Sequence, residues 1–226
     1  MRILRNNIYL LVLVCSLIIL SGCNKEETKS IEPIESKKFT PVFTSSQIPS
    51  DIYENMIGKS IPNKEQVDIS QLSYLKVTYY GFDDKPHIGE IIVDKSVSNE
   101  VLDIFEELYS KKYPIEKISL IDKYDAIDDL SMKDNNTSAF CYREIAGSNK
   151  LSNHSKGLAI DINPLINPMV KNGEVSPREG IDYIDRELNV KGMITKGDAC
   201  YEAFTKRGWT WGGDWTSLKD YQHFER

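Results

Sequence analysis

The chain has 226 residues, of which 40% are hydrophobic and 27% are charged, and its formal net charge at pH 7 is -6. A nucleic-acid partner would require a basic face, so the acidic balance argues against one. The length that remains once the N-terminal segments described below are set aside suits a single domain with one sizeable core.

The first 22 residues have the pattern of a secretory signal. Arg2 and Arg5 precede an apolar run at residues 8–20, which is shorter than the roughly 20 residues that a spanning helix needs. The run ends in Leu20-Ser21-Gly22-Cys23, which resembles the processing box of bacterial lipoproteins. The resemblance implies cleavage before Cys23, lipidation of its sulfur, and an extracytoplasmic protein anchored to the bacterial cell membrane and facing the wall. The alternative is an ordinary cleaved signal with a chance cysteine.

Residues 23–51 are polar, contain three prolines and lack a sustained hydrophobic period. We therefore predict a tether over residues 23–51 and one domain over residues 52–226. An ordered arm packed on that domain is the alternative for the tether, because Phe39, Val42 and Phe43 are apolar.

The predicted elements of the domain follow in chain order. Residues 75–80 and 89–93 are β-rich and flank a turn-prone segment, which predicts a hairpin. Ser98 is expected to cap a helix that ends before Pro114, because apolar residues recur at helical spacing between them. Residues 115–121 and 138–145 are predicted strands, and the second of them carries Arg143.

The C-terminal half continues with a predicted strand at residues 158–162 and a long surface excursion at residues 163–189, a length typical of lids or inserts. Asp198 opens a second helix, which Gly208 closes. Together these elements predict an α+β fold with a central, mainly antiparallel sheet flanked by helices.

Two short stretches contain two of the three histidines of the chain. One stretch is residues 152–163, with His154 and Asp161, and the other is residues 220–223, with Asp220 and His223. A catalytic zinc takes three protein ligands from imidazole nitrogen and carboxylate oxygen and leaves a fourth position to water. His154, Asp161 and His223 supply such a set, while Asp220 is placed to take a proton from a water that zinc activates.

The pattern Ser-x-His-x-x-Gly-x-Ala-x-Asp, followed by acid-x-x-His, resembles the zinc peptidases of bacterial peptidoglycan that include the D-alanyl-D-alanine carboxypeptidases and dipeptidases. An aspartate before the last histidine and the run Trp209-Thr210-Trp211-Gly212-Gly213-Asp214-Trp215 look most like the L-alanyl-D-glutamate endopeptidase branch. The resemblance covers residues 72–226. It implies a monomeric zinc enzyme that cuts peptidoglycan stem peptides. A D-alanyl-D-alanine carboxypeptidase and a non-catalytic wall-binding lipoprotein are the alternatives.

The resemblance also implies residue roles. His154, Asp161 and His223 are expected to bind Zn²⁺, and Asp220 to act as the general base. Arg143 and Ser152 match positions that contact the substrate or stabilise the developing oxyanion. The alternative for Arg143 is an ion pair with a surface acid, which would contribute little.

Other residues allow two interpretations each. Cys141 and Cys200 are expected to form a disulfide, because cysteine pairs outside the membrane tend to oxidise; two buried free thiols are the alternative. At least two of the three tryptophans are expected to be buried. Asp214 either anchors the glycine turn or supports a metal ligand, and His87 is expected to be a structural residue of the hairpin turn.

Overall fold

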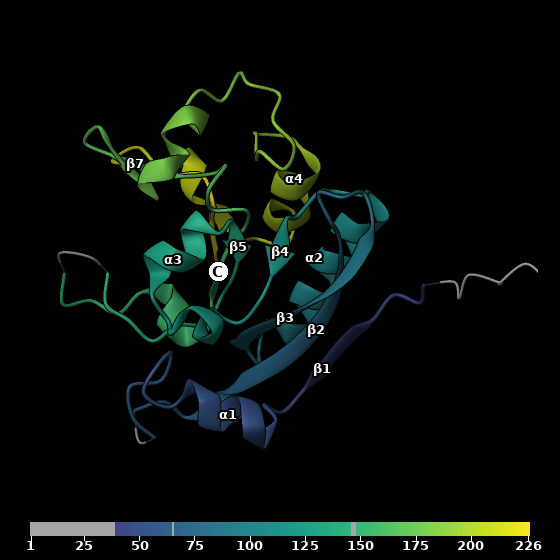
Figure 1. The fold of residues 1–226 in the computed structure, drawn as a ribbon, viewed down its shortest axis with the longest axis vertical. Helices are drawn as coiled ribbons and strands as arrows, with labels where there is room; N and C mark the ends of the chain where they lie inside the picture. Colours follow the sequence, from purple (N-terminus) through teal and green to yellow (C-terminus); the bar gives the residue numbers. More distant parts are fainter. Residues whose placement is uncertain (1–38, 65, 146–147) are drawn as a thin grey trace, which may run out of the picture. The chain divides into compact units, whose positions relative to one another are not determined.

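The two longest strands of the protein form a β-hairpin, in a computed structural model that describes residues 39–64, 66–145 and 148–226. Its two strands are β2 (Leu72–Tyr80) and β3 (Pro86–Asp94), which pair in antiparallel register along their whole length. The short strand β1 (Phe43–Ser46) pairs antiparallel with the outer side of β2 (Figure 1). The predicted hairpin is therefore confirmed, with strands longer than predicted.

Both faces of this sheet are covered. The helix α2 (Ser98–Ser110) packs on one face, where alternate residues of β2 meet its apolar side in the main core. The helix α1 (Ser50–Met56) belongs to a second core on the other face, where Met56 packs with Leu72, Tyr74 and Ile92. Side chains alternate between the two faces of a strand, so β2 contributes to both cores at once.

The helix predicted from Ser98 is confirmed, and its apolar positions Val101, Ile104, Phe105 and Leu108 are all buried. The capping prediction was wrong by one residue. Val97 is the N-cap residue, without a side-chain hydrogen bond, and the Ser98 hydroxyl instead donates to the carbonyl of Lys95 at 3.0 Å.

The predicted tether over residues 23–51 extends too far. Residues 43–46 are strand β1 and residue 50 begins α1, so the ordered-arm alternative holds for that part of the segment. The apolar side chain of Phe43 explains this, because it packs against the main core. The predicted signal segment, Cys23 and residues 24–38 lie outside the described residues, and lipidation stays a prediction.

Three further sheets are small. The first has the order β6-β11-β9 and is antiparallel, with β6 (Ala159–Asp161), β11 (His223–Glu225) and β9 (Thr210–Trp211). The second, also antiparallel, has the order β10-β7-β8, with β10 (Lys219–Asp220), β7 (Met169–Lys171) and β8 (Glu174–Ser176). The third pairs β4 (Lys117–Ile118) with β5 (Asn136–Thr137) in parallel.

The α+β class is thus confirmed, but the strands form four sheets rather than one central sheet. Two predicted strands were largely wrong. Residues 115–121 form only the two-residue β4 and then enter a 3-10 helix at Ile121–Tyr124, and residues 138–145 form no named strand. The remaining helical elements are α3 (Asp128–Lys133), α4 (Ala199–Thr205) and 3-10 turns at Ile69–Gln71, Asn153–Lys156, Arg178–Tyr183 and Gly212–Asp214.

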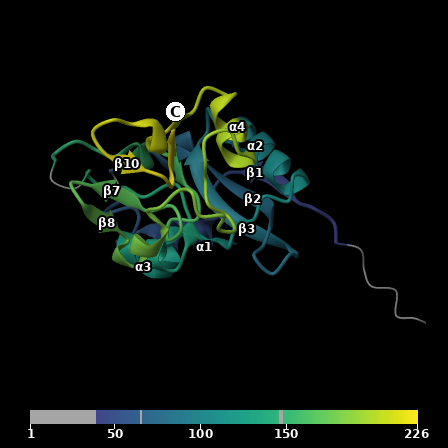
Figure 2. The ribbon, with the colours of Figure 1, turned by 90° about the horizontal axis from the view of Figure 1, so that it is seen from above.

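The long excursion at residues 163–189 is anchored to the rest of the domain. Its strand β7 pairs with β10, placing Met169 opposite Asp220 (Figure 2). Arg186 donates to the carbonyl oxygens of Ile166, Tyr183 and Ile194, and its guanidinium lies 4.4 Å from the ring centroid of Tyr221. The excursion therefore supports the strand that carries Asp220.

The second predicted helix is confirmed as α4, where Asp198 accepts a hydrogen bond from the backbone N–H of Tyr201. The predicted disulfide was wrong, since Cys141 and Cys200 are both free and buried. They lie in different surroundings: Cys200 is in the main core on α4, whereas Cys141 is near Arg143 and Asp128. Within the described residues, no helix is long and apolar enough to cross a membrane.

Candidate metal centre

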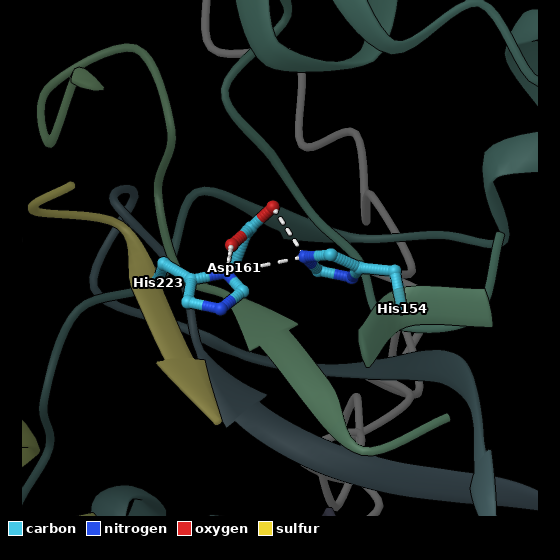
Figure 3. A group of neighbouring side chains, drawn as sticks. All are labelled: His154, Asp161 and His223. Atoms are coloured by element: carbon cyan, nitrogen blue, oxygen red, sulfur yellow. Dashed lines mark hydrogen bonds and ion pairs between the residues drawn. The ribbon is translucent and has the colours of Figure 1, made fainter. Parts of the chain in front are cut away.

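His154, Asp161 and His223 converge on one buried point (Figure 3). The two imidazoles approach from opposite sides, with His154 Nε2 lying 3.2 Å from His223 Nδ1. The Asp161 carboxylate lies between them, with Oδ2 3.1 Å from His154 Nε2 and Oδ1 3.0 Å from His223 Nδ1. The side chains are only 4%, 7% and 9% exposed in chain order, so the groups are largely removed from bulk water.

A 3-10 turn, Asn153–Lys156, positions His154. Ser152 is its N-cap residue and its hydroxyl accepts a hydrogen bond from the backbone N–H of His154 at 3.3 Å. Gly157 ends the turn with φ +72°, and a Cβ there would lie 2.4 Å from the backbone nitrogen of Asp94. The turn after His154 thus requires glycine for both conformation and space.

The pairing of β6 with β11 brings the other two groups together. His223 lies directly opposite Asp161 in the antiparallel register, although 62 positions separate them along the chain. Ile160 and Ile162 on the opposite face are fully buried in the main core. Side chains therefore alternate along the strand predicted at residues 158–162, and burial of the isoleucines fixes the direction of Asp161.

A hydrogen bond on the outer side of each imidazole ring determines which ring nitrogen carries the proton and which keeps its lone pair. His154 Nδ1–H donates to the carbonyl oxygen of Ala139 at 2.6 Å, which leaves the Nε2 lone pair directed at the common point. His223 Nε2–H donates to Glu225 Oε2 at 3.2 Å, which leaves Nδ1 directed there. Both rings can therefore offer nitrogen lone pairs to one cation.

The spacing of the donor atoms fits zinc. Ligands at 2.0–2.1 Å in tetrahedral geometry are separated by about 3.3 Å from one another. At this site the two imidazole nitrogens are 3.2 Å apart, and each lies 3.0 or 3.1 Å from a different oxygen of the Asp161 carboxylate. With one ligand atom taken from each residue, the three atoms lie within 4.8 Å of one another. Among the described residues the cluster has three members rather than four, which matches a catalytic centre with an open position better than a closed structural one.

The charges are strongly coupled when no cation is bound. Burial alone would raise the pKa of Asp161, but the charge and hydrogen bonds of the two histidines hold it well below its usual range. Burial likewise lowers the pKa of His223, but hydrogen bonds to Asp161 and Glu225 raise it to about 10. A cation that binds here therefore takes the place of a proton on His223.

Asp220 lies beside the centre but is not one of its three converging groups. Burial raises its pKa to about 6; the positive charge of His223 opposes this shift and the negative charge of Asp161 reinforces it. Its Oδ1 is buried and has no hydrogen-bond partner among the described residues. The backbone of Asp220 lies close to Gly212, and only glycine leaves room for it, since a Cβ at position 212 would lie 2.5 Å from the carbonyl oxygen of Asp220.

Arg143 also borders the centre, through a partner that the sequence analysis missed. Its Nη2 lies 3.0 Å from Oδ2 of Asp128 on α3. Both side chains are about one-third exposed. Burial lowers the pKa of Arg143, but the negative charges of Asp128 and Asp161 raise it above its ordinary value. The Arg143 Nε is buried without a hydrogen-bond partner among the described residues. Arg143 thus pairs with an acid, as in the alternative interpretation, but it does so next to the three converging groups.

The structure gives the other predicted residues structural positions. Among the described residues, the one hydrogen bond of the Ser152 hydroxyl is that which it accepts from the backbone N–H of His154, so its substrate role stays a prediction. Trp209 and Trp211 are buried as predicted. The half-buried Trp215 lies 5.4 Å from His223 between ring centroids.

Two further assignments are resolved by contacts outside the centre. Asp214 bonds to Lys196 and Tyr201, which agrees with neither predicted role. His87 bonds to Asp83 in the hairpin turn, as expected for a structural residue.

These features define the class of site: a buried group of two imidazoles and one carboxylate, with a carboxylate of raised pKa and a guanidinium beside it. Residues 146–226, the last 81 of the 226, match a family model described as D-alanyl-D-alanine carboxypeptidase. The match includes His154, Asp161, Asp220 and His223, and it begins three residues after Arg143. No curated protein and no solved structure matches the chain significantly.

Proposed function

We propose that the protein is a zinc-dependent peptidase that hydrolyses a peptide bond in the stem peptide of peptidoglycan. The convergence of His154, Asp161 and His223, whose ligand atoms lie within 4.8 Å of one another in a buried site, carries this proposal. The family match over residues 146–226 supports the peptidase class and the substrate class. The N-terminal sequence adds the expectation of an extracytoplasmic lipoprotein, which gives access to that substrate.

The chemistry assigns a task to each neighbouring group. Zinc held by the two histidines and Asp161 supplies Lewis acidity, which makes water a nucleophile at neutral pH and polarises a carbonyl. Asp220 accepts a proton from the attacking water while the water oxygen forms its bond to the carbonyl carbon. Asp220 then delivers that proton to the amine nitrogen as the C–N bond breaks.

Arg143 is proposed to hold the substrate carbonyl or a substrate carboxylate, with Asp128 fixing its orientation. Arg143→Lys retains the charge beside Asp128 but removes the planar fork of donors. We expect kcat to fall about 10²-fold, as for loss of one oxyanion donor, with zinc content unchanged. The control is Arg178→Lys, the same substitution at an exposed arginine. Unchanged kcat in Arg143→Lys would exclude a role for the guanidinium in the reaction.

The bond that is cut has two candidates. The aspartate at position 220 and the tryptophan-rich run favour cleavage between L-Ala and D-Glu, by the resemblance that the sequence carries. The description of the matched family instead favours removal of a terminal D-Ala. We expect digestion of defined muropeptides to release L-Ala from the D-Glu amine, identified by product mass. Release of D-Ala alone would replace the first candidate by the second.

A non-catalytic wall-binding protein is the alternative of another class. All three ligands and the adjacent carboxylate are retained, which is what hydrolysis requires and mere binding does not. The digest distinguishes the two when it is run before and after chelation. Wall binding without any product in the zinc-loaded state would support the non-catalytic alternative.

A further inference from the structure

We propose that Glu225 is a positioning residue that holds His223 in the orientation and tautomer needed for metal binding. The inference rests on the proposed zinc site and assigns it a supporting group that the sequence motifs do not contain. Glu225 lies two residues after His223 on β11, and residues two apart in a strand point to the same face. Its Oε2 accepts from His223 Nε2–H at 3.2 Å, on the side of the ring opposite the proposed metal position.

Glu225 is itself held in place by the other motif stretch. Asn153 Nδ2 donates to the same Oε2 at 2.8 Å, across 72 positions of the sequence. Asn153 begins the 3-10 turn that carries His154. The chain of hydrogen bonds from Asn153 through Glu225 to His223 therefore links the turn that carries one proposed ligand to the strand that carries another.

The tautomer is the main consequence of this contact. A neutral imidazole has one N–H, and a carboxylate at Nε2 keeps the proton there and leaves Nδ1 free as a ligand. A carboxylate partner also makes the coordinating nitrogen more basic. The main-chain carbonyl of Ala139 does the same for His154. Of these two supporting groups, the Glu225 carboxylate can be removed by a side-chain substitution, whereas the Ala139 carbonyl belongs to the main chain.

Glu225 does not fit the role of the proton-accepting base. It contacts Nε2, whereas Asp161 and His154 lie at Nδ1 on the other side of the ring. Asp220, by contrast, has a buried oxygen that lacks a hydrogen-bond partner in the part of the chain that the structure describes. The effect of Glu225 therefore acts through His223 and not on the substrate.

The test is zinc affinity, measured by chelator competition on the full chain. Removal of an outer carboxylate of this kind weakens metal binding about 10–100-fold, and we expect that loss for Glu225→Ala. Glu225→Gln retains a neutral acceptor for Nε2–H, so its affinity is expected to lie between those of Glu225→Ala and the wild type. Asn153→Ala, which frees Glu225, is expected to weaken zinc binding less than Glu225→Ala.

Glu100→Ala is the matched control. Glu100 is also partly buried and accepts a hydrogen bond from an aromatic N–H, that of Trp209 at 2.7 Å, but it does not contact the metal centre. Its loss is expected to change thermal stability without changing zinc affinity. A purely structural role for Glu225 predicts the same behaviour for Glu225→Ala.

A spectroscopic readout is available because the chain has only three histidines. Imidazole ¹⁵N NMR of the zinc-loaded wild type is expected to show a proton on Nε2 of His223, and a weakened or shifted Nε2–H signal in Glu225→Ala. Zinc affinity within twofold of the wild type in folded Glu225→Ala would overturn the inference. If that variant does not fold, unchanged affinity in Glu225→Gln and Asn153→Ala would do so. Failure of the wild type to bind zinc would instead refute the proposed function.

Discussion

Replacing Asp220 by Asn should lower kcat about 10²–10⁴-fold while zinc remains bound, because that range is typical for loss of a general base. Asparagine has the size of aspartate but cannot accept a proton. The substitution removes a negative charge that lies beside the three ligands without being one of them. Kinetics on a defined muropeptide, together with the zinc content of the purified protein, measure the two effects separately.

The pH dependence gives a second readout for Asp220. The base must be ionised, so kcat/KM should fall as the pH decreases through the pKa of this carboxyl. Its pKa is about 6 without a cation, and a bound cation lowers it, so the acid limb should lie at or below about pH 6. Asp214→Asn is the control, since Asp214 bonds to Lys196 and Tyr201 outside the centre. Full activity in Asp220→Asn would refute its role as the base.

The buried carboxylate also has a cost in stability. Its folded-state pKa is raised above the ordinary value of 3.8, so the unfolded chain releases this proton at lower pH than the folded one. The free energy of unfolding therefore falls as the pH rises from about 4 to 6. Asparagine does not ionise, so Asp220→Asn removes this loss of unfolding free energy. The metal-free variant should therefore be at least as stable as the metal-free wild type at pH 7.

The sequence predicts the part of the site in which residues close together in the chain determine where the side chains point. His154 and Asp161 belong to one short stretch, where the turn at Gly157 and the alternation after it determine where both side chains point. The α2 helix is equally predictable, because its four buried apolar residues recur at helical spacing. In each case the neighbours in sequence supply most of the information.

The segment at residues 138–145 shows why other predictions were wrong. Its apolar residues suggest a strand, but successive backbone N–H groups donate to three different places. Phe140 donates to Ile92, Cys141 to His154 and Tyr142 to Ser60. Backbone groups must be paired when buried, yet nothing requires that their partners form one ladder. Sequence patterns do not reveal such scattered partners.

The contacts that support the ligands are also distant in sequence. The Ala139 carbonyl has no side-chain signature at all, and Asn153 and Glu225 are 72 positions apart. The excursion at residues 163–189 was predicted only as a surface segment, because its pairing with Asp220 depends on a strand about fifty residues away. The motif thus predicts which residues converge, whereas the hydrogen bonds that hold each of them in place depend on tertiary structure.

Replacing His154 by Ala should abolish the stabilisation that zinc gives to the protein. Ligand binding to the folded state adds about 4 kcal/mol at a free zinc concentration 1,000 times Kd. For a domain of this size that corresponds to a rise in Tm of about 8–16 °C. His154→Ala removes one of the three proposed ligands, and the two that remain are not expected to form the site. Thermal unfolding with zinc and with chelator measures the difference.

The comparison must use the zinc-dependent shift and not the absolute Tm, because His154 also contributes to the metal-free fold. Its loss leaves the Ala139 carbonyl without the ring that donates to it and leaves the buried Asp161 paired with His223 alone, which destabilises the protein with or without zinc. His87→Ala is the matched control, since this partly exposed histidine hydrogen-bonds to Asp83 and stacks on Tyr79 in the hairpin, away from the metal centre, and its loss should leave the shift intact. A shift of wild-type size in His154→Ala would place the zinc elsewhere, and the proposed hydrolysis would then lose its catalytic centre.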